Sequence, residues 1–217
     1  MLEKTKNRGV SEQYNLMAKN PKLSREWHPT KNGGLTPYNI TPGSSKKAWW
    51  ICEKGHEYKT LVKVRSRGSL CPYCTNRKVC IDNCLATISP DISKKWHPTK
   101  NGDLTPFEVT PYSHTTAWWI CSMGHQYTST IENQSKCIRG GCPYCAGRKP
   151  CKDNSFASKN PDLTKEWHLT KNGALTPDEI TYNSHKMSWW ICPKGHEYEA
   201  FPHRRTAGDN CPFCSSH

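Results

Sequence analysis

The apolar residues of this chain fall into short runs separated by polar and turn-forming residues, and the run Trp49-Trp50-Ile51-Cys52 predicts a β-strand. The segment Gly55-His56-Glu57-Tyr58 follows at the spacing of a turn and a return strand, so the two together predict a hairpin. Successive side chains of a strand point to opposite faces. One indole of the Trp49-Trp50 pair is therefore expected in the core, and the other is expected to cover a neighbouring element or to stack on a base.

Two short helical segments are expected before this hairpin. The first begins at Asn20, an N-cap residue followed by proline at the first helical position. Leu23 and Trp27 lie four residues apart and should share one face of that helix, which Pro29 should end. The second is a helical turn starting at Thr36-Pro37, just after an Asn-Gly tight turn.

This order of short helical segments and a hairpin occurs three times along the chain, with a period of about 70 residues. Three signatures return in the same order: a Trp-His-x-Thr-Lys-Asn-Gly segment, a Trp-Trp-Ile-Cys strand and a Cys-Pro-x-Cys turn. The variable residue is proline in the first two copies of the segment and Leu169 in the third, and tyrosine in the first two copies of the turn and Phe213 in the third. Their copies start at Trp27, Trp96 and Trp167; at Trp49, Trp118 and Trp189; and at Cys71, Cys142 and Cys211. We predict an N-terminal tail over 1–13 and three modules over 14–80, 81–151 and 152–217.

Each repeat carries the same four candidate metal ligands, in the order Cys-x3-His followed by Cys-x2-Cys. Three thiolates and one imidazole form a closed tetrahedral zinc site, so we predict three structural Zn²⁺ ions. Iron–sulfur ligation is disfavoured by the histidine, and a catalytic zinc is disfavoured because four protein ligands leave no position for water. The predicted ligands are Cys52, His56, Cys71 and Cys74; Cys121, His125, Cys142 and Cys145; and Cys192, His196, Cys211 and Cys214.

Composition supports several small metal-held units over one large core. The chain has 217 residues, of which only 34% are hydrophobic, yet it contains 13 cysteines and 9 tryptophans. Because it shows no secretory signal and no apolar stretch of membrane-spanning length, we expect an intracellular protein, in the cytoplasm or nucleoid, or in the nucleus of a eukaryote. Thiols are kept reduced there, which favours metal over disulfides.

Four cysteines lie outside the predicted ligand sets. They are Cys80, Cys84, Cys137 and Cys151. For the repeated pair Cys80 and Cys151, small buried hydrophobic residues are the favoured interpretation, with reserve metal ligands or redox-sensing thiols as the alternatives. Cys137 could compete with Cys142 for metal, but the Cys-Pro-Tyr-Cys register favours Cys142.

On these motifs, from about residue 14 to residue 217, the chain resembles a tandem zinc-ribbon or treble-clef zinc-finger family known as a domain of unknown function. An Arg-Lys pair also follows the Cys-Pro-Tyr-Cys turn in the first two repeats, as Arg77-Lys78 and Arg148-Lys149. The chain departs from the family pattern at Leu169, which replaces a proline, and after Cys214, where no Arg-Lys pair follows. The resemblance implies small α+β modules, each a β-hairpin followed by a short helix whose N-terminus supplies the last two ligands. Some relatives are attached to nuclease-like domains, which implies work on DNA.

Charge points to a polyanionic partner. The formal net charge is +13, and three sites of net charge −1 would reduce it to about +10. We expect contacts with nucleic acid from basic or polar residues that repeat without a folding reason. They are Lys31, Asn32, Lys100, Asn101, Lys171 and Asn172 in the tight turns; Arg65, Arg67, Arg139, Arg204 and Arg205 after the hairpins; and Arg77, Lys78, Arg148 and Lys149 after the Cys-Pro-Tyr-Cys turns.

The three repeated histidines His28, His97 and His168 are expected to be hydrogen-bonded structural residues, because each ligand set is already complete. The leading functional hypothesis is a protein that binds nucleic acid, double-stranded DNA in particular, and that has no membrane partner. The alternative is a zinc-dependent protein-interaction adaptor or inhibitor, in a phage, mobile-element or DNA-processing system, with a nuclease or another DNA-processing protein as partner. An enzyme is not expected, because the histidines of the hairpins are used by zinc.

Overall fold

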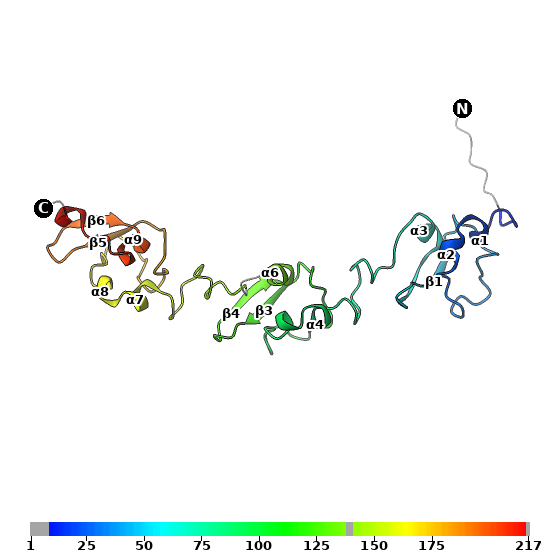
Figure 1. Ribbon diagram of the computed structural model, residues 1–217, viewed down its shortest axis with the longest axis horizontal. Helices are drawn as coiled ribbons and strands as arrows, with labels where there is room; N and C mark the ends of the chain where they lie inside the picture. Colours follow the sequence, from blue (N-terminus) through cyan, green and yellow to red (C-terminus); the bar gives the residue numbers. More distant parts are fainter. Residues whose placement is uncertain (1–8, 138–140, 216–217) are drawn as a thin grey trace, which may run out of the picture. The chain divides into compact units, whose positions relative to one another are not determined.

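The structure of the protein is a computed structural model that describes residues 9–137 and 141–215 (Figure 1). Two compact units are distinguished by their internal contacts. The first comprises Met1–Ile88 and Pro106–Thr110, and the second comprises Ser89–Thr105 and Pro111–His217. The middle repeat contributes residues to both units. The boundaries of the three sequence modules stay predictions.

The first unit contains one complete repeat and the start of the next. Two short helices precede an antiparallel hairpin, a third helix follows it directly, and a fourth lies at the end of the unit's main segment. These elements are α1 (Leu16–Lys19), α2 (Pro21–Ser24), β1 (Lys47–Ile51), β2 (Glu57–Leu61), α3 (Val62–Ser66) and α4 (Leu85–Ile88). In the hairpin, Trp50 pairs with Tyr58 and Trp49 with Lys59.

The second unit repeats this order. Its two hairpins are separate two-stranded sheets, each followed at once by a short helix. Among the described residues its elements are α5 (Pro90–Ser93), β3 (Thr116–Ile120), β4 (Gln126–Thr130), α6 (Ile131–Lys136), α7 (Phe156–Lys159), α8 (Pro161–Thr164), β5 (Ser188–Ile191), β6 (Glu197–Ala200), α9 (Pro202–Thr206) and α10 (Pro212–Ser215). No described helix is long and apolar enough to cross a lipid bilayer.

The second indole of each Trp-Trp pair lies at the centre of a small core. Trp50, Trp119 and Trp190 are completely buried, whereas the preceding tryptophan of each strand is partly exposed. Trp27 meets Trp50 edge to face, with 5.1 Å between the ring centroids. The predicted hairpins and the opposite placement of the paired indoles are therefore confirmed.

The helices that begin at proline are shorter than the sequence indicates. Helix α2 ends at Ser24, so Trp27 does not share a helical face with Leu23. The chain instead runs beside β1, because the His28 N–H donates to the Trp49 carbonyl and the Ile51 N–H donates to the Glu26 carbonyl. Two strand-like hydrogen bonds and a ring contact to Trp50 thus replace one further helical turn.

Two other local expectations differ from the structure. The segment at Thr36-Pro37 forms a hydrogen-bonded turn, with the Asn39 N–H donating to the Thr36 carbonyl, and is not helical. Helix α6 follows its hairpin at a place where the sequence predicts no helix. The helices α3 and α9 lie where the sequence shows only a basic stretch. They position Arg65 and Arg205, whose side chains turn inward.

Candidate metal centres

The four predicted ligands of the first repeat converge on one point. The Nδ1 atom of His56 lies 3.4 Å from the sulfur of Cys52, 3.3 Å from that of Cys74 and 3.7 Å from that of Cys71. The sulfur atoms of Cys52 and Cys74 are 3.7 Å apart. A tetrahedral zinc ion with bonds of about 2.3 Å to sulfur and about 2.0 Å to nitrogen requires edges of about 3.5–3.8 Å. The donor set therefore fits zinc.

The second and third repeats have the same arrangement. The Nδ1 atom of each histidine lies 3.3–3.8 Å from the three sulfur atoms of its set. All ligand atoms of a set are within 4.8 Å of one another. The sets are Cys121, His125, Cys142 and Cys145, and Cys192, His196, Cys211 and Cys214.

A tight turn at the end of the first strand holds the first two ligands. The Cys52 N–H donates to the His56 carbonyl, and the Gly55 N–H donates to the Cys52 carbonyl. Gly55 has a φ of 82°, in the left-handed region that favours glycine. The Gly-His dipeptide of the sequence thus places a thiol and an imidazole on one side of the turn.

Local hydrogen bonds lower the pKa of one thiol in each ligand set. Burial raises the pKa of the Cys121 thiol, but hydrogen bonds from the backbone of His125 and Met123 outweigh it and lower the pKa to about 7. Burial and the neighbouring thiols raise the pKa of Cys145 to about 12. One thiolate of the set forms readily at neutral pH, and the bound metal must displace the remaining protons.

All thirteen cysteines are free, so none of them is taken from the metal sets by a disulfide. Three cysteines and one histidine complete the preferred coordination of a structural zinc ion. Zinc would supply the folding free energy that such small cores lack. The prediction of three structural zinc sites, one in each repeat, is confirmed.

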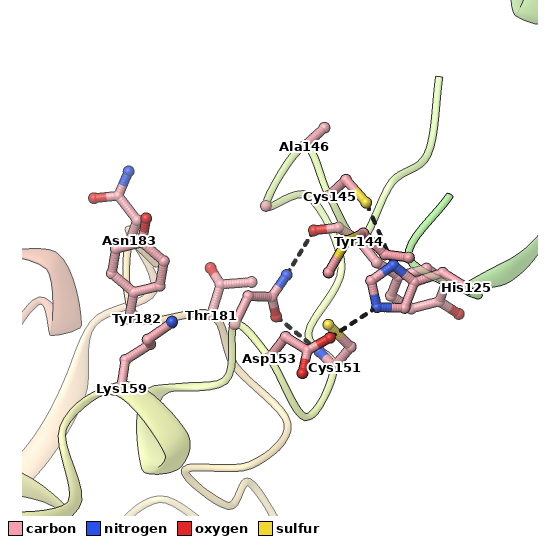
Figure 2. Close-up of a pocket in the computed structure, with 13 residues that line it drawn as sticks. His125, Tyr144, Cys145, Ala146, Cys151, Asp153, Lys159, Thr181, Tyr182 and Asn183 are labelled. Carbon is pink, nitrogen blue, oxygen red and sulfur yellow. Dashed lines mark hydrogen bonds and ion pairs between the residues drawn. The ribbon is translucent and has the colours of Figure 1, made fainter. Parts of the chain in front are cut away.

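In two of the metal sites, an aspartate carboxylate lies against the imidazole nitrogen that faces away from the metal position. The Nε2 atom of His56 lies 2.9 Å from Asp82 Oδ2, and that of His125 lies 3.3 Å from Asp153 Oδ2. Figure 2 shows His125 between the Cys145 sulfur and the Asp153 carboxylate. Because Nε2 donates to the carboxylate, Nδ1 is left free to bind metal.

An asparagine fixes the segment that carries each of these carboxylates. The Asn83 side chain donates to the carbonyls of Tyr73 and Lys78, both 2.8 Å away, and accepts from the Cys80 N–H. Asn154 makes the equivalent three bonds in the second unit. Sequence reasoning missed this element, although a Cys-x-Asp-Asn motif occurs at Cys80 and at Cys151 and could have indicated it.

The remaining cysteines have different surroundings. Cys84 is completely buried. Cys80 is half-buried, and its sulfur lies 3.6 Å from Nε2 of His56, outside the predicted ligand set. Cys151 occupies the same position beside His125 and Asp153. Cys137 is half-buried and belongs to none of the clusters found among the described residues.

The tight-turn lysines of the first and third repeats have partners inside their own unit. The Lys31 ammonium forms an ion pair with Glu57 and lies 5.2 Å from the ring centroid of Trp49. Lys171 pairs in the same way with Glu197. Hydrogen bonds from Lys31 and then from His28 hold the pKa of Glu57 below its usual range, so this carboxylate neutralises Lys31 at neutral pH.

The asparagine and histidine of the same segment are structural. Asn32 accepts from the Trp49 N–H at 2.7 Å and donates to the Trp49 carbonyl at 3.0 Å, as a neighbouring strand would. Asn101 and Asn172 do the same in their repeats. His28 accepts at Nδ1 from two backbone N–H groups, which confirms the expectation of a hydrogen-bonded histidine. These asparagines have no free amide to offer a partner.

Arg65 and Arg205 do not fit the expectation that they contact nucleic acid. Their side chains are buried, and each donates at 2.5 Å to a glutamate, Glu26 or Glu166. Each guanidinium also lies over the buried tryptophan of its hairpin. A buried, paired arginine cannot reach a phosphate in the folded protein, so these residues fasten α3 and α9 to the cores.

The other basic candidates lie on the surface. Arg77 donates to the Leu70 carbonyl and Arg148 donates to the Gly141 carbonyl, so both also close the turn that carries the last two ligands. Arg139 lies outside the described residues. Seven exposed basic candidates have no described carboxylate partner: Arg67, Arg77, Lys78, Lys100, Arg148, Lys149 and Arg204.

A family model described as a probable treble clef zinc finger domain matches the chain three times, at residues 23–77, 92–148 and 163–217. No curated protein matches the chain. Each match contains one hairpin and one complete Cys3His set, in agreement with the predicted fold class. Since the three matches cover most of the sequence, the chain belongs to this treble clef zinc finger family, in three tandem copies.

Proposed function

We propose that the protein binds nucleic acid, and double-stranded DNA in particular, through the surfaces of its three zinc-held repeats. The observation that carries this proposal is the positive charge that the fold leaves unpaired. The formal net charge is +13, and only a minority of the described lysines and arginines form ion pairs with carboxylates. Such an excess attracts a polyanion and releases its counterions on binding.

Exposed lysines beside the zinc-binding turns support this proposal. Lys78 and Lys149 follow the last two ligands of the first and second repeats, and neither has a described carboxylate partner. The zinc ion and the bonds of the neighbouring arginines hold this backbone in place. A lysine on a rigid turn loses less entropy when it contacts a phosphate.

In this proposal the zinc ions are structural and the protein is not an enzyme. Each ligand set fills four coordination positions, which leaves none for a reacting water. Three linked binding surfaces of modest affinity would reinforce one another through their effective concentration.

Fluorescence anisotropy of the zinc-loaded chain with labelled duplex DNA, single-stranded DNA and RNA tests the proposal. We expect the duplex to bind most tightly, and the logarithm of its binding constant to fall linearly with the logarithm of salt concentration. Absence of binding to all three at ~50 mM salt would contradict nucleic-acid binding. Tighter binding of RNA or single-stranded DNA would contradict the choice of duplex.

A pair of double variants makes the test specific. Lys78→Gln with Lys149→Gln should reduce the salt slope by about 1.8, the value for two phosphate contacts. The matched control is Lys94→Gln with Lys165→Gln, which removes the same charge from exposed lysines that are paired with Asp91 and Asp162. Equal effects of the two double variants would show that these turns are not the contact surface.

A further inference from the structure

The three repeats differ at one position of an otherwise repeated cluster. In the first repeat, the two carboxylate oxygens of Glu57 receive separate donors: His28 Nε2 at 2.9 Å and the Lys31 ammonium. In the third repeat, Glu197 holds His168 Nε2 at 3.0 Å and the Lys171 ammonium. A histidine and a lysine thus bind one oxyanion in both repeats.

The second repeat has the two donors without the oxyanion. Gln126 stands where the other repeats have glutamate, and its Oε1 accepts from Lys100 at 2.5 Å. The Nε2 atom of His97 is buried and has no hydrogen-bond partner among the described residues. Only 5% of the His97 surface is exposed, so this is an unusual place for an unpaired polar atom.

The protonation of His97 is set by its other nitrogen. Nδ1 accepts from the backbone N–H groups of Thr99 and Lys100, both at 3.3 Å. In the neutral ring Nε2 therefore carries the proton and is a donor. Gln126 offers one acceptor atom where a glutamate offers two, and that atom is used by Lys100. One buried donor and one full positive charge remain uncompensated.

We propose that His97 and Lys100 form a phosphate-binding site in the second repeat, in which an oxygen pair of an external phosphate takes the place of the glutamate carboxylate. This inference rests on the proposed function, in which the phosphate belongs to the DNA backbone. It assigns the three equivalent lysines different roles, because only Lys100 keeps its charge free for a partner.

The surroundings of the site allow a phosphate to enter. Gln126 is exposed, and its one described side-chain hydrogen bond is the one to Lys100, so its side chain can turn toward solvent. Trp118, which is 36% exposed, forms one wall, with the Lys100 nitrogen 4.4 Å from its ring centroid. Among the described residues, no carboxylate lies within ion-pair distance of Lys100.

The variant Gln126→Glu supplies the missing carboxylate at nearly constant size. We expect it to occupy His97 and Lys100 as Glu57 occupies its partners, and to lower the salt slope of DNA binding by about 0.9, the value for one phosphate contact. The matched control is Asn133→Asp, an amide-to-acid change at an exposed position of α6. If both variants reduce the slope equally, general charge explains the effect and the site is refuted.

The opposite substitution at the equivalent position of the first repeat, glutamate to glutamine, is an independent test. Glu57→Gln should recreate the arrangement of the second repeat, free Lys31, and raise the salt slope by about 0.9. An unchanged slope would show that an unneutralised lysine at this position does not contact phosphate, which would overturn the proposal. Circular dichroism of each variant establishes that the zinc-loaded fold is intact before binding is compared.

A titration with inorganic phosphate separates this inference from the proposed function. In nuclear magnetic resonance spectra of the whole zinc-loaded chain, phosphate should shift the His97 ring and Lys100 side-chain signals saturably, and Gln126→Glu should abolish those shifts. If the chain fails to bind DNA but shows these shifts, the proposed function fails and the phosphate site stands. If it binds DNA and phosphate leaves these signals unchanged, the site fails and the proposed function stands.

Discussion

At the scale of single residues, the structure gives several repeated polar side chains a role in folding and leaves others on the surface. Asn32 replaces a missing neighbouring strand, and Arg65 carries its charge into the core to meet Glu26. Both types of residue are common in nucleic-acid contacts, which is why the sequence suggested that function for them. Burial and fixed hydrogen bonds distinguish the two roles, and neither can be read from a single sequence.

Asp82 should strengthen zinc binding in the first repeat only. Replacing it with alanine removes the acceptor of His56 Nε2, and loss of such a partner typically weakens metal affinity 10- to 100-fold. We therefore expect Asp82→Ala to release one zinc ion of the chain about 10-fold more readily to a competing chelator, and to leave the others unchanged.

The exposed Asp91, which pairs with Lys94 and is not near a ligand set, provides the control. Asp91→Ala should leave the release of all zinc ions as in the unaltered protein. Equal release curves for Asp82→Ala and the unaltered chain would show that the carboxylate does not support the metal site.

Arg65 should contribute to stability and not to DNA affinity. Removing one member of a buried ion pair leaves the other charge without compensation, so Arg65→Ala should lower the free energy of unfolding by about 3 kcal/mol. The exposed neighbour Arg67, changed to alanine, should alter it by less than about 0.5 kcal/mol.

Urea unfolding of the zinc-loaded variants, followed by tryptophan fluorescence, measures this difference. An Arg65→Ala protein that is as stable as the unaltered one and binds DNA more weakly would reverse the assignment of this residue.

At the scale of elements, the sequence predicts the hairpins and ligand turns well and the helices poorly. Strand alternation in Trp49-Trp50 and the fixed Cys-x3-His spacing are local constraints, so they could be predicted from one repeat. Helix α2 is shorter than expected because pairing with β1 competes with helix propagation after Ser24. Helix α3 was missed because its stability comes from the tertiary contacts of Val62 and Arg65.

The candidate site was predictable to the same extent. All twelve metal ligands follow from sequence spacing. The carboxylates that orient His56 and His125, those of Asp82 and Asp153, come from the segments that lead into the next repeat. The contact between His56 and Asp82 joins residues 26 positions apart, and no local sequence pattern specifies it. The unpaired Nε2 atom of His97 was not predictable either, because the glutamates that bind the equivalent His28 and His168 lie 29 residues away in sequence.

The turn between the first two ligands should depend on glycine. An alanine at Gly124 meets no atom within 4 Å, so its cost is the backbone strain of a φ of 78°. We expect Gly124→Ala to weaken the second metal site by about 1–2 kcal/mol, measured by competition with a chelator. Gly43→Ala, also in open space but without a positive φ, should leave metal binding unchanged.

At the scale of the whole molecule, metal explains how so polar a chain folds. Only 34% of its residues are hydrophobic, and each described core is built around a few aromatic rings. Binding of a structural zinc ion can contribute about 10–16 kcal/mol to the folding of such a small unit. Because zinc stabilises the fold, the chain can keep basic residues that would attract DNA at positions where a larger core would require apolar residues.

Native mass spectrometry of the purified full chain tests the central claim, that three Cys3His sets each hold one structural zinc ion. The account predicts a single dominant species with three bound zinc ions, and two in a variant with Cys142→Ser and Cys145→Ser. One zinc ion or none in the unaltered chain, or three in the double variant, would contradict it.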